Sequence, residues 1–330
     1  MVSFIEPTRW IPLLKRIKIL RDIMLMFKIS AKFPIFLLVE PTNDCNLDCY
    51  FCPRKTSRRM VGYMDFDLYK RIIDESVKFG KRMMLGLQKD GEPLLHPSIL
   101  EMIKYAKDKS ASYVLHLATN GLVLDEEMAI GILNSGLDDL LISIDAAKTE
   151  TYKKIKGRDS LHQVEMNVHR FLQLKEKIKS KKPFVRVKLV KTDHNIEELE
   201  LFRQKWKGLV DWVEITEFFQ WGDMVNIDSG ITNNLSRYPC LFPWYWPAIN
   251  WNGTVSVCCY DYDSEGIMGN LYEDTLFNIW RSSNFQDIRY AHLSGIYEKI
   301  PICAKCRPRS MSPNIGNWLR KSFLHNQANR

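Results

Sequence analysis

The eight cysteines of the chain fall into two groups that lie far apart in the sequence. The first group is Cys45, Cys49 and Cys52, spaced C-x3-C-x2-C. Three thiolates on one tight loop can bind three irons of a cubane cluster and leave the fourth iron open for a substrate or cofactor. Zinc is the alternative, but it usually takes four protein ligands, or three and a water, and no histidine lies in this loop. The spacing therefore predicts an iron–sulfur cluster loop.

The second group comprises Cys240, Cys258, Cys259, Cys303 and Cys306. Four thiolates from three separate segments can close a metal site, and the metal would hold an irregular region together. On ligand type alone, zinc fits this site as well as an iron–sulfur cluster does. Cys259 is left over. If Cys258 lies on a strand and faces the metal, Cys259 faces the other side. There it is either a small buried apolar residue or a thiol that gives a hydrogen atom to a carbon radical.

The elements that must position the first group form a repeating series from residue 35 onward. Apolar runs alternate with amphipathic helices, which predicts βα units and a parallel sheet. The predicted strands are 36–40, 83–88, 113–118, 140–144, 184–190 and 212–216, and the predicted helices are 67–78, 98–107, 125–135, 162–177 and 196–205. Six strands give an α/β fold with a partial (β/α)6 TIM-like barrel, because a closed barrel needs eight. The cysteine loop follows the first strand, at the end where such folds place their active sites.

Polar turns follow the next three predicted strands: Gly91-Glu92-Pro93, Thr119-Asn120-Gly121 and Ser143-Ile144-Asp145. Alone, each is an ordinary turn or helix start. Together with the cysteine loop, over residues 35–220, they resemble the radical S-adenosylmethionine (radical SAM) enzymes. The resemblance implies that Cys45, Cys49 and Cys52 hold a [4Fe–4S] cluster whose open iron binds S-adenosylmethionine.

The resemblance also implies which residues contact the S-adenosylmethionine. Phe51 would touch the adenine, and the turn of Gly91, Glu92 and Pro93 would meet the amino group of the methionine moiety. Asn120, Ser143 and Asp145 would lie near the nucleoside. Many members of the family have a glycine where this chain has Asp90. The implied reaction is reductive cleavage of S-adenosylmethionine to a 5′-deoxyadenosyl radical, which abstracts a hydrogen atom from an unactivated carbon.

Residues 221–330 are predicted to form a smaller, irregular module. Residues 251–254 read as a hairpin turn before a strand at 255–258, and 276–280 as a short helix. This region resembles the SPASM and shortened twitch extensions of radical SAM enzymes. The resemblance implies one auxiliary [4Fe–4S] cluster on Cys240, Cys258, Cys303 and Cys306, because no cysteine follows Cys306. Four thiolates would saturate that cluster, which suits an electron acceptor, a relay or a structural staple.

Composition sets the remaining limits. The 330 residues are 45% hydrophobic and 26% charged, values typical of a folded protein. The net charge of +8 is concentrated in residues 1–33, with seven bases against two acids, so the rest of the chain is nearly neutral and no nucleic-acid partner is expected. Residues 1–34 predict a basic amphipathic helix, packed on the body or, through residues 9–28, touching a membrane surface. No signal peptide or membrane span is seen, so a cytoplasmic location is expected.

The function expected from this resemblance is hydrogen abstraction from a sugar-like or cyclitol-like small molecule, giving oxidation or epimerisation. A flavodoxin or ferredoxin would supply the electron. A peptide-modifying maturase is an alternative, although 34 residues before the barrel are too few for the peptide-binding domain such enzymes often carry. A lipid-linked substrate is a further alternative. A metal-stapled electron-transfer scaffold is the alternative that is not an enzyme.

Overall fold

A computed structural model describes residues 33–79, 83–218 and 240–306 of the chain. The predicted N-terminal helix and both ends of the predicted C-terminal module lie outside the described residues. The described part contains one nine-stranded sheet in the order β6-β5-β4-β3-β2-β1-β7-β8-β9. Its first six strands are β1 (Phe36–Val39), β2 (Met84–Leu87), β3 (Val114–Thr119), β4 (Asp139–Ser143), β5 (Phe184–Lys191) and β6 (Trp212–Glu217). Neighbouring strands from β1 to β6 are parallel, which confirms the expected open, partial barrel.

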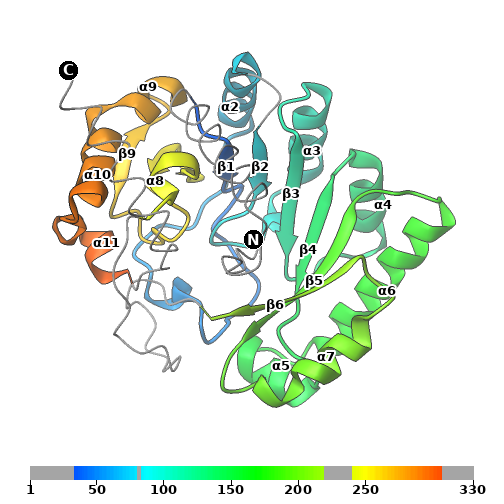
Figure 1. Cartoon of the computed structure of the whole chain (residues 1–330). Helices are drawn as coiled ribbons and strands as arrows, with labels where there is room; N and C mark the ends of the chain where they lie inside the picture. Colours follow the sequence, from blue (N-terminus) through cyan, green and yellow to red (C-terminus); the bar gives the residue numbers. More distant parts are fainter. Residues whose placement is uncertain (1–32, 80–82, 219–239, 307–330) are drawn as a thin grey trace, which may run out of the picture.

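Helices cover the outer face of this curved sheet (Figure 1). They are α2 (Phe66–Lys78), α3 (Ile99–Asp108), α4 (Glu126–Ser135), α5 (Thr149–Lys156), α6 (Leu161–Lys177) and α7 (Leu199–Trp206). Asp65 begins α2 and Asp125 begins α4, because each carboxylate accepts the backbone N–H three residues later. Gly136 ends α4 at φ 80°, a left-handed conformation that glycine adopts without steric cost. The sequence predicted all of these helices except α5.

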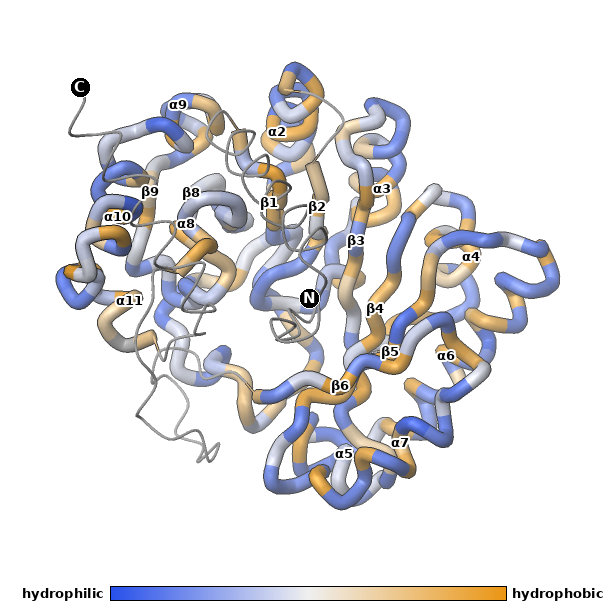
Figure 2. Tube along the Cα trace, viewed as in Figure 1, coloured by the Kyte–Doolittle hydropathy of each residue, from blue (hydrophilic) through white to orange (hydrophobic). Residues whose placement is uncertain are grey.

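The core lies between the sheet and these helices. On β3, Leu115 and Leu117 are fully buried on the helix side, whereas His116 lies on the opposite, concave face. Figure 2 shows hydrophobic residues along the central strands and hydrophilic ones on the outer turns of the helices. The helix-facing residues of the strands therefore anchor the sheet and leave its concave face available for polar side chains.

The C-terminal region continues the same sheet. It contains β7 (Ala248–Ile249), β8 (Thr254–Ser256), β9 (Ile267–Asn270), α8 (Phe242–Tyr245), α9 (Leu276–Arg281), α10 (Ser283–Ser294) and α11 (Pro301–Lys305). Strand β7 pairs in parallel with β1, and β8 and β9 follow antiparallel. The predicted hairpin is present, with Gly253 at φ 82° in its turn. The C-terminal cysteines therefore belong to a region that extends the sheet from β1, the strand that precedes the first cysteine loop.

The predicted strand at 255–258 is too long. Strand β8 ends at Ser256, and Cys258 and Cys259 lie in the bend and turn that follow. The backbone leaves the sheet here, since Val257 N–H donates to Gly266 O and Asp261 N–H donates to Cys258 O. The alternation of a strand therefore does not place Cys258 and Cys259 on opposite faces.

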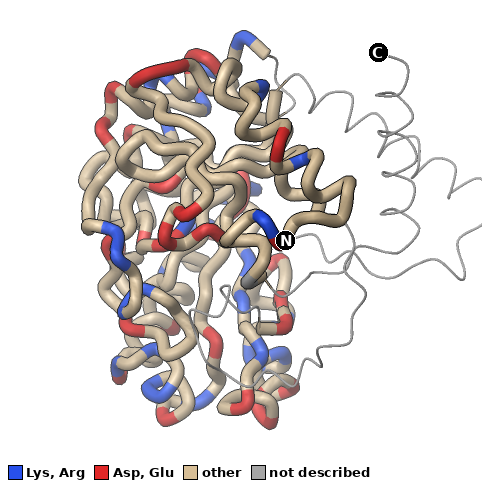
Figure 3. The backbone as a smooth tube through the Cα atoms, turned by 90° about the vertical axis from the view of Figure 1, so that its left-hand side faces the viewer, with Lys and Arg blue, Asp and Glu red and all other residues tan. Residues whose placement is uncertain are grey.

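Positions of basic and acidic residues are interspersed along the backbone in Figure 3. Among the described residues, no helix is both long enough and apolar enough to cross a membrane.

Candidate active site and cluster loops

The first cysteine loop runs from the C-terminal end of β1 to the short 3-10 helix η1 (Pro53–Thr56). Two backbone hydrogen bonds hold the loop against the C-terminal end of helix α5: Asp48 N–H donates to Lys156 O (3.2 Å), and Tyr50 N–H donates to Ile155 O (2.9 Å). A third bond, from Cys52 N–H to Cys49 O (3.0 Å), closes the loop on itself. Three cysteines are thus held on one short irregular segment at the carboxyl edge of the sheet.

The three thiols lie in a partly buried, low-dielectric setting. Burial raises the pKa of Cys45 to about 12 and that of Cys52 to about 11, and it also raises the pKa of Cys49. The other two cysteines add to the shift at Cys45, so the three sulfurs lie near one another. In the described ranges, no three Cys, His, Asp or Glu side chains are preassembled as a metal site. The sulfurs nevertheless fit a cluster, because bound iron draws thiols together as thiolates and reverses the effect of burial.

The Gly-Glu-Pro turn packs directly on this loop. Glu92 N–H donates to Asp44 O at 2.7 Å, one residue before Cys45. The buried Glu92 carboxylate accepts hydrogen bonds from Thr119 Oγ1 (2.7 Å), Asn120 N–H (2.7 Å) and Leu94 N–H (3.1 Å). Burial raises its pKa, and these donors oppose the rise. Glu92 therefore joins the ends of β2 and β3, and Pro93 begins the 3-10 helix η2 (Pro93–Leu95).

Gly91 is the residue in this turn that tolerates no side chain. A Cβ there would lie 2.5 Å from both Thr42 O and Asp44 O, which are backbone atoms. We expect Gly91→Ala to cost about 1–3 kcal/mol of stability, as overpacking does, and to displace the cysteine loop. Gly131→Ala in α4 is the matched control, because its Cβ would meet the flexible end of Leu100. Equal melting temperatures and iron contents for the two variants would contradict this prediction.

The other predicted cofactor residues lie around the same edge. Asn120 donates through Nδ2 to Asn46 Oδ1 (2.7 Å) and lies 4.0 Å from Cys45 Sγ. Phe51 is half-buried, 5.5 Å from the Tyr50 ring and 6.0 Å from the Phe218 ring. Ser143 donates to Asp145 Oδ2 at 2.8 Å. The structure thus brings the motif residues together at the ends of four adjacent strands.

A buried lysine that the sequence analysis missed completes this arrangement. Lys156 Nζ donates to Asp145 Oδ2 at 2.5 Å, and both side chains are almost fully buried. Its positive charge also acts on Cys49, where it opposes the effect of burial on the thiol pKa. Helix α5 ends at Gly157, whose φ is 74°, and Gly157 packs against the backbone of Asp48 in the cysteine loop. The sequence does carry a signal for α5: residues 149–157 have an acidic first turn, a basic last turn and a final glycine, a combination typical of a helix.

His96, at the end of the Gly-Glu-Pro turn, uses both ring nitrogens in local contacts. Its Nε2 lies 2.9 Å from Met64 O, and its Nδ1 accepts Ser98 N–H at 3.1 Å.

The second cysteine group lies in the C-terminal region. Burial raises the pKa of Cys258 well above its usual value, and Cys259, Cys240 and Cys303 add to the rise, so these thiols are neighbours. Cys303 lies on α11, and Cys306 follows it with its N–H donating to Cys303 O at 3.2 Å. None of the eight cysteines is in a disulfide. The thiols can therefore serve as ligands, as the sequence analysis proposed.

The two cysteine loops are in contact through Tyr262. Its hydroxyl lies 3.9 Å from Cys52 Sγ, and it stands four residues after Cys258. Burial, first, and the neighbouring Cys52 raise the pKa of Tyr262, so the hydroxyl keeps its proton. When Cys52 is a thiolate, Tyr262 is therefore the donor of this contact.

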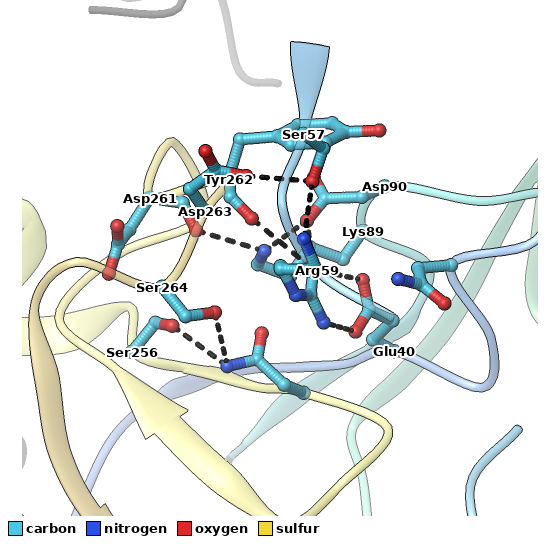
Figure 4. Close-up of polar contacts among 12 residues, drawn as sticks. Glu40, Ser57, Arg59, Lys89, Asp90, Ser256, Asp261, Tyr262, Asp263 and Ser264 are labelled. Carbon is cyan, nitrogen blue, oxygen red and sulfur yellow. Dashed lines mark hydrogen bonds and ion pairs between the residues drawn. The ribbon is translucent and has the colours of Figure 1, made fainter. Parts of the chain in front are cut away.

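A buried ionic network fixes the same junction (Figure 4). Arg59 donates to both oxygens of Glu40, to Asp90 Oδ2 (2.8 Å) and to Tyr262 O (3.3 Å). Lys89 Nζ pairs with Asp90 and donates to Asp261 O at 3.1 Å. Asp90, through Arg59 and Lys89, thus links the end of β2 to the C-terminal region.

The pKa values of the two carboxylates in this network, Glu40 and Asp90, are shifted in opposite directions. Burial acts to raise the pKa of Glu40, but Lys89 and Arg59 hold it below its usual range. Burial raises the pKa of Asp90 to about 7 despite the neighbouring Lys89.

Comparison with known proteins agrees with this geometry. Residues 39–200 match the model of the radical SAM superfamily, and residues 240–307 match that of an iron–sulfur cluster-binding domain, SPASM. The chain belongs to the radical SAM superfamily and carries a SPASM-type cluster domain. The cofactors of this class are a [4Fe–4S] cluster, S-adenosylmethionine and auxiliary iron–sulfur clusters.

Relatives with assigned names differ in what they act on. A tungsten-containing aldehyde ferredoxin oxidoreductase cofactor-modifying protein of Pyrococcus furiosus is 25% identical, over 83% of this chain and 87% of its own. The AdoMet-dependent heme synthase of Methanosarcina barkeri is 34% identical, but over 38% of this chain and 35% of its own.

Solved structures show the same fold. BtrN in complex with AdoMet and 2-DOIA aligns over 85% of this chain and 95% of its own, with a TM-score of 0.58 and 19% identity. Streptococcus suis SuiB bound to S-adenosylmethionine aligns over 84% of this chain and 73% of its own, with a TM-score of 0.65 and 14% identity.

Proposed function

We propose that this protein is a radical SAM oxidoreductase that oxidises a polar small molecule of the sugar or cyclitol kind. The observation that carries the proposal is the junction between the two cysteine loops. Tyr262 touches Cys52 and stands four residues from Cys258, so one short segment connects the two sites. When bound, the first cluster and S-adenosylmethionine supply a hydrogen-abstracting radical, and the auxiliary cluster supplies an electron acceptor.

Each residue group has a defined part in this function. Cys45, Cys49 and Cys52 would hold the first cluster, and Cys240, Cys258, Cys303 and Cys306 a single auxiliary one. Glu92 and Asn120 fix the turns at the ends of β2 and β3 against that loop. Phe51, Ser143 and Asp145 would line the nucleoside site, with Lys156 holding Asp145 in place. The substrate loses a hydrogen atom, a proton and one electron, which amounts to a two-electron oxidation.

The concave face of the sheet supports a polar substrate. Arg186 donates to Asp139 Oδ1 (2.9 Å) and Glu214 Oε2 (2.7 Å), and Asp139 also pairs with His116. Among the described residues, Glu214 Oε1 is buried without a hydrogen-bond partner. These side chains line the base of the concave face, at the amino ends of the strands, since Asp139 is the first residue of β4. Such a face suits a polyol or amino sugar better than an apolar chain.

The Pyrococcus furiosus relative suggests a second class of substrate. It is named as a cofactor-modifying protein, and it matches most of both chains. A small cofactor precursor is therefore the second candidate substrate for the same reaction.

Hydrogen abstraction can be tested without knowing the substrate in advance. The reconstituted protein would be reduced with S-adenosylmethionine and offered perdeuterated cyclitols, amino sugars and peptides in parallel. We expect deuterium in 5′-deoxyadenosine with a polyol or amino sugar. Deuterium transfer from peptides alone would contradict the proposal, and so would the absence of S-adenosylmethionine cleavage.

Cys259→Ala separates oxidation from epimerisation. Cys259 lies in the turn beside Cys258, and an epimerase would need it to return a hydrogen atom to the substrate radical. For an oxidase, we expect product formation to continue at a rate close to that of the native protein. Loss of product while 5′-deoxyadenosine still forms would identify Cys259 as a hydrogen donor and contradict the oxidase.

A further inference from the structure

A histidine that neither cysteine motif includes lies between two of the C-terminal cysteines. His292, on α10, is buried, with 4% of its surface exposed. Its Nε2 lies 3.4 Å from Cys303 Sγ, and its Nδ1 accepts the backbone N–H of Cys240 at 3.3 Å. One imidazole therefore bridges the segment of Cys240 and the helix of Cys303, which are 63 positions apart in the sequence.

The partners of the ring assign its tautomer. A neutral imidazole has one N–H donor and one acceptor nitrogen. Because Cys240 N–H donates to Nδ1, the proton of the ring is on Nε2, directed at Cys303 Sγ. The lone pair that a metal would need is already engaged at Nδ1. The geometry therefore makes His292 a donor to sulfur and not a metal ligand.

The surroundings hold the ring in this orientation. The Tyr297 ring stacks on it at 5.7 Å, and the Trp244 ring meets it edge-on at 6.3 Å. Three residues earlier on the same helix, Arg289 is buried, and its Nε donates to Pro243 O at 2.9 Å. Residues three apart on a helix share a face, so α10 presents two buried N–H-bearing side chains to the Cys240 segment. Such donors favour negative charge nearby.

We propose that His292 is a positioning residue that donates a hydrogen bond to the Cys303 thiolate and raises the reduction potential of the auxiliary cluster. The inference rests on the proposed role of Cys303 as a ligand. Hydrogen bonds to cluster sulfurs stabilise the reduced, more negative state, and outer partners of ligands also fix their orientation. A raised potential suits a cluster that accepts an electron from a substrate radical.

Two substitutions separate the nitrogens of the ring. In His292→Asn, the amide oxygen can take the place of Nδ1 and keep the bond from Cys240, but the donor to Cys303 is lost. In His292→Gln, the amide nitrogen can take the place of Nε2 and keep that donor. His162→Asn, at an exposed histidine of α6, is the control. All three would be made in the Cys45/Cys49/Cys52→Ala background, so that the auxiliary cluster alone is observed.

The readouts are iron content and the midpoint potential of the auxiliary cluster from an EPR-monitored titration. We expect a lower potential, or loss of iron, in His292→Asn, and values close to the background in His292→Gln and His162→Asn. An unchanged potential in His292→Asn would overturn the inference. The same fall, or the same loss of iron, in both His292 variants would also overturn it, because the ring and not its N–H would then matter.

A measurement on the unsubstituted histidine removes any dependence on the folding of variants. With ¹⁵N-labelled histidine in the same background, pulsed EPR of the reduced cluster should show a weak nitrogen coupling, as expected through a hydrogen bond. A strong coupling would indicate direct ligation, and no coupling would indicate no bond; either overturns the inference. If the background protein binds no auxiliary cluster, the proposed function itself fails. If the cluster binds but has no histidine coupling, only the inference fails.

Discussion

Replacing Cys45, Cys49 and Cys52 together with alanine is expected to reduce S-adenosylmethionine cleavage to the background of the chemical reductant. These thiols lie on the loop that α5 and the Gly-Glu-Pro turn hold at the end of β1. Without them, no open iron remains to bind the methionine moiety, because four thiolates would saturate the auxiliary cluster. The measurement is the yield of 5′-deoxyadenosine per protein under anaerobic reduction.

The control for this prediction is the native chain carried through the same procedure without iron. It should be as inactive as the triple variant, and it should recover when iron and sulfide are added. The triple variant should not recover. Sustained 5′-deoxyadenosine formation by the reconstituted triple variant would show that the cleaving cluster is held elsewhere.

Arg59→Met is expected to destabilise the protein by about 3–5 kcal/mol, the usual cost of breaking a buried ionic network from one side. Its guanidinium compensates Glu40 and Asp90, whose side chains are fully buried, and it also reaches Tyr262 O. Methionine would leave both carboxylates without this partner. The change should appear in the free energy of unfolding by denaturant.

Arg58→Met is the matched control, because Arg58 is the neighbouring residue and its side chain is 77% exposed. Its ion pairs with Asp263 and Glu265 are of the exposed kind, worth at most about 1 kcal/mol. Equal unfolding free energies for the two variants would show that the network does not hold the C-terminal region against the core.

Much of the fold was predictable because its signals are local. Apolar β-branched strands and amphipathic helices repeat through residues 35–217, and all six predicted core strands are present. The cysteine loop, Glu92 and Asn120 were predictable because motifs at successive strand ends of a parallel sheet converge on one edge. The pairing of β7 with β1 was not predictable, since a two-residue strand carries almost no pattern.

The long-range polar contacts also had no local signal. Arg59 was one of four bases after the cysteine loop, and nothing in its neighbours distinguished it from the exposed Arg58. His292 was one of seven scattered histidines, and its contact with Cys303 depends on how α10 and α11 pack. The strand alternation applied to Cys258 and Cys259 was wrong because β8 ends two residues earlier. The misses at Arg59 and His292 concern residues whose roles are set by a distant partner.

Iron, sulfide and zinc content after anaerobic reconstitution tests the central claim, that the chain holds two cubane clusters. The native chain should contain about eight irons, and the Cys45/Cys49/Cys52→Ala variant about four, with no zinc in either. Mössbauer spectra of both samples should show [4Fe–4S] clusters. About four irons in the native chain, none in the variant and one zinc retained in each would contradict the claim, and the C-terminal cysteines would then form a structural zinc site.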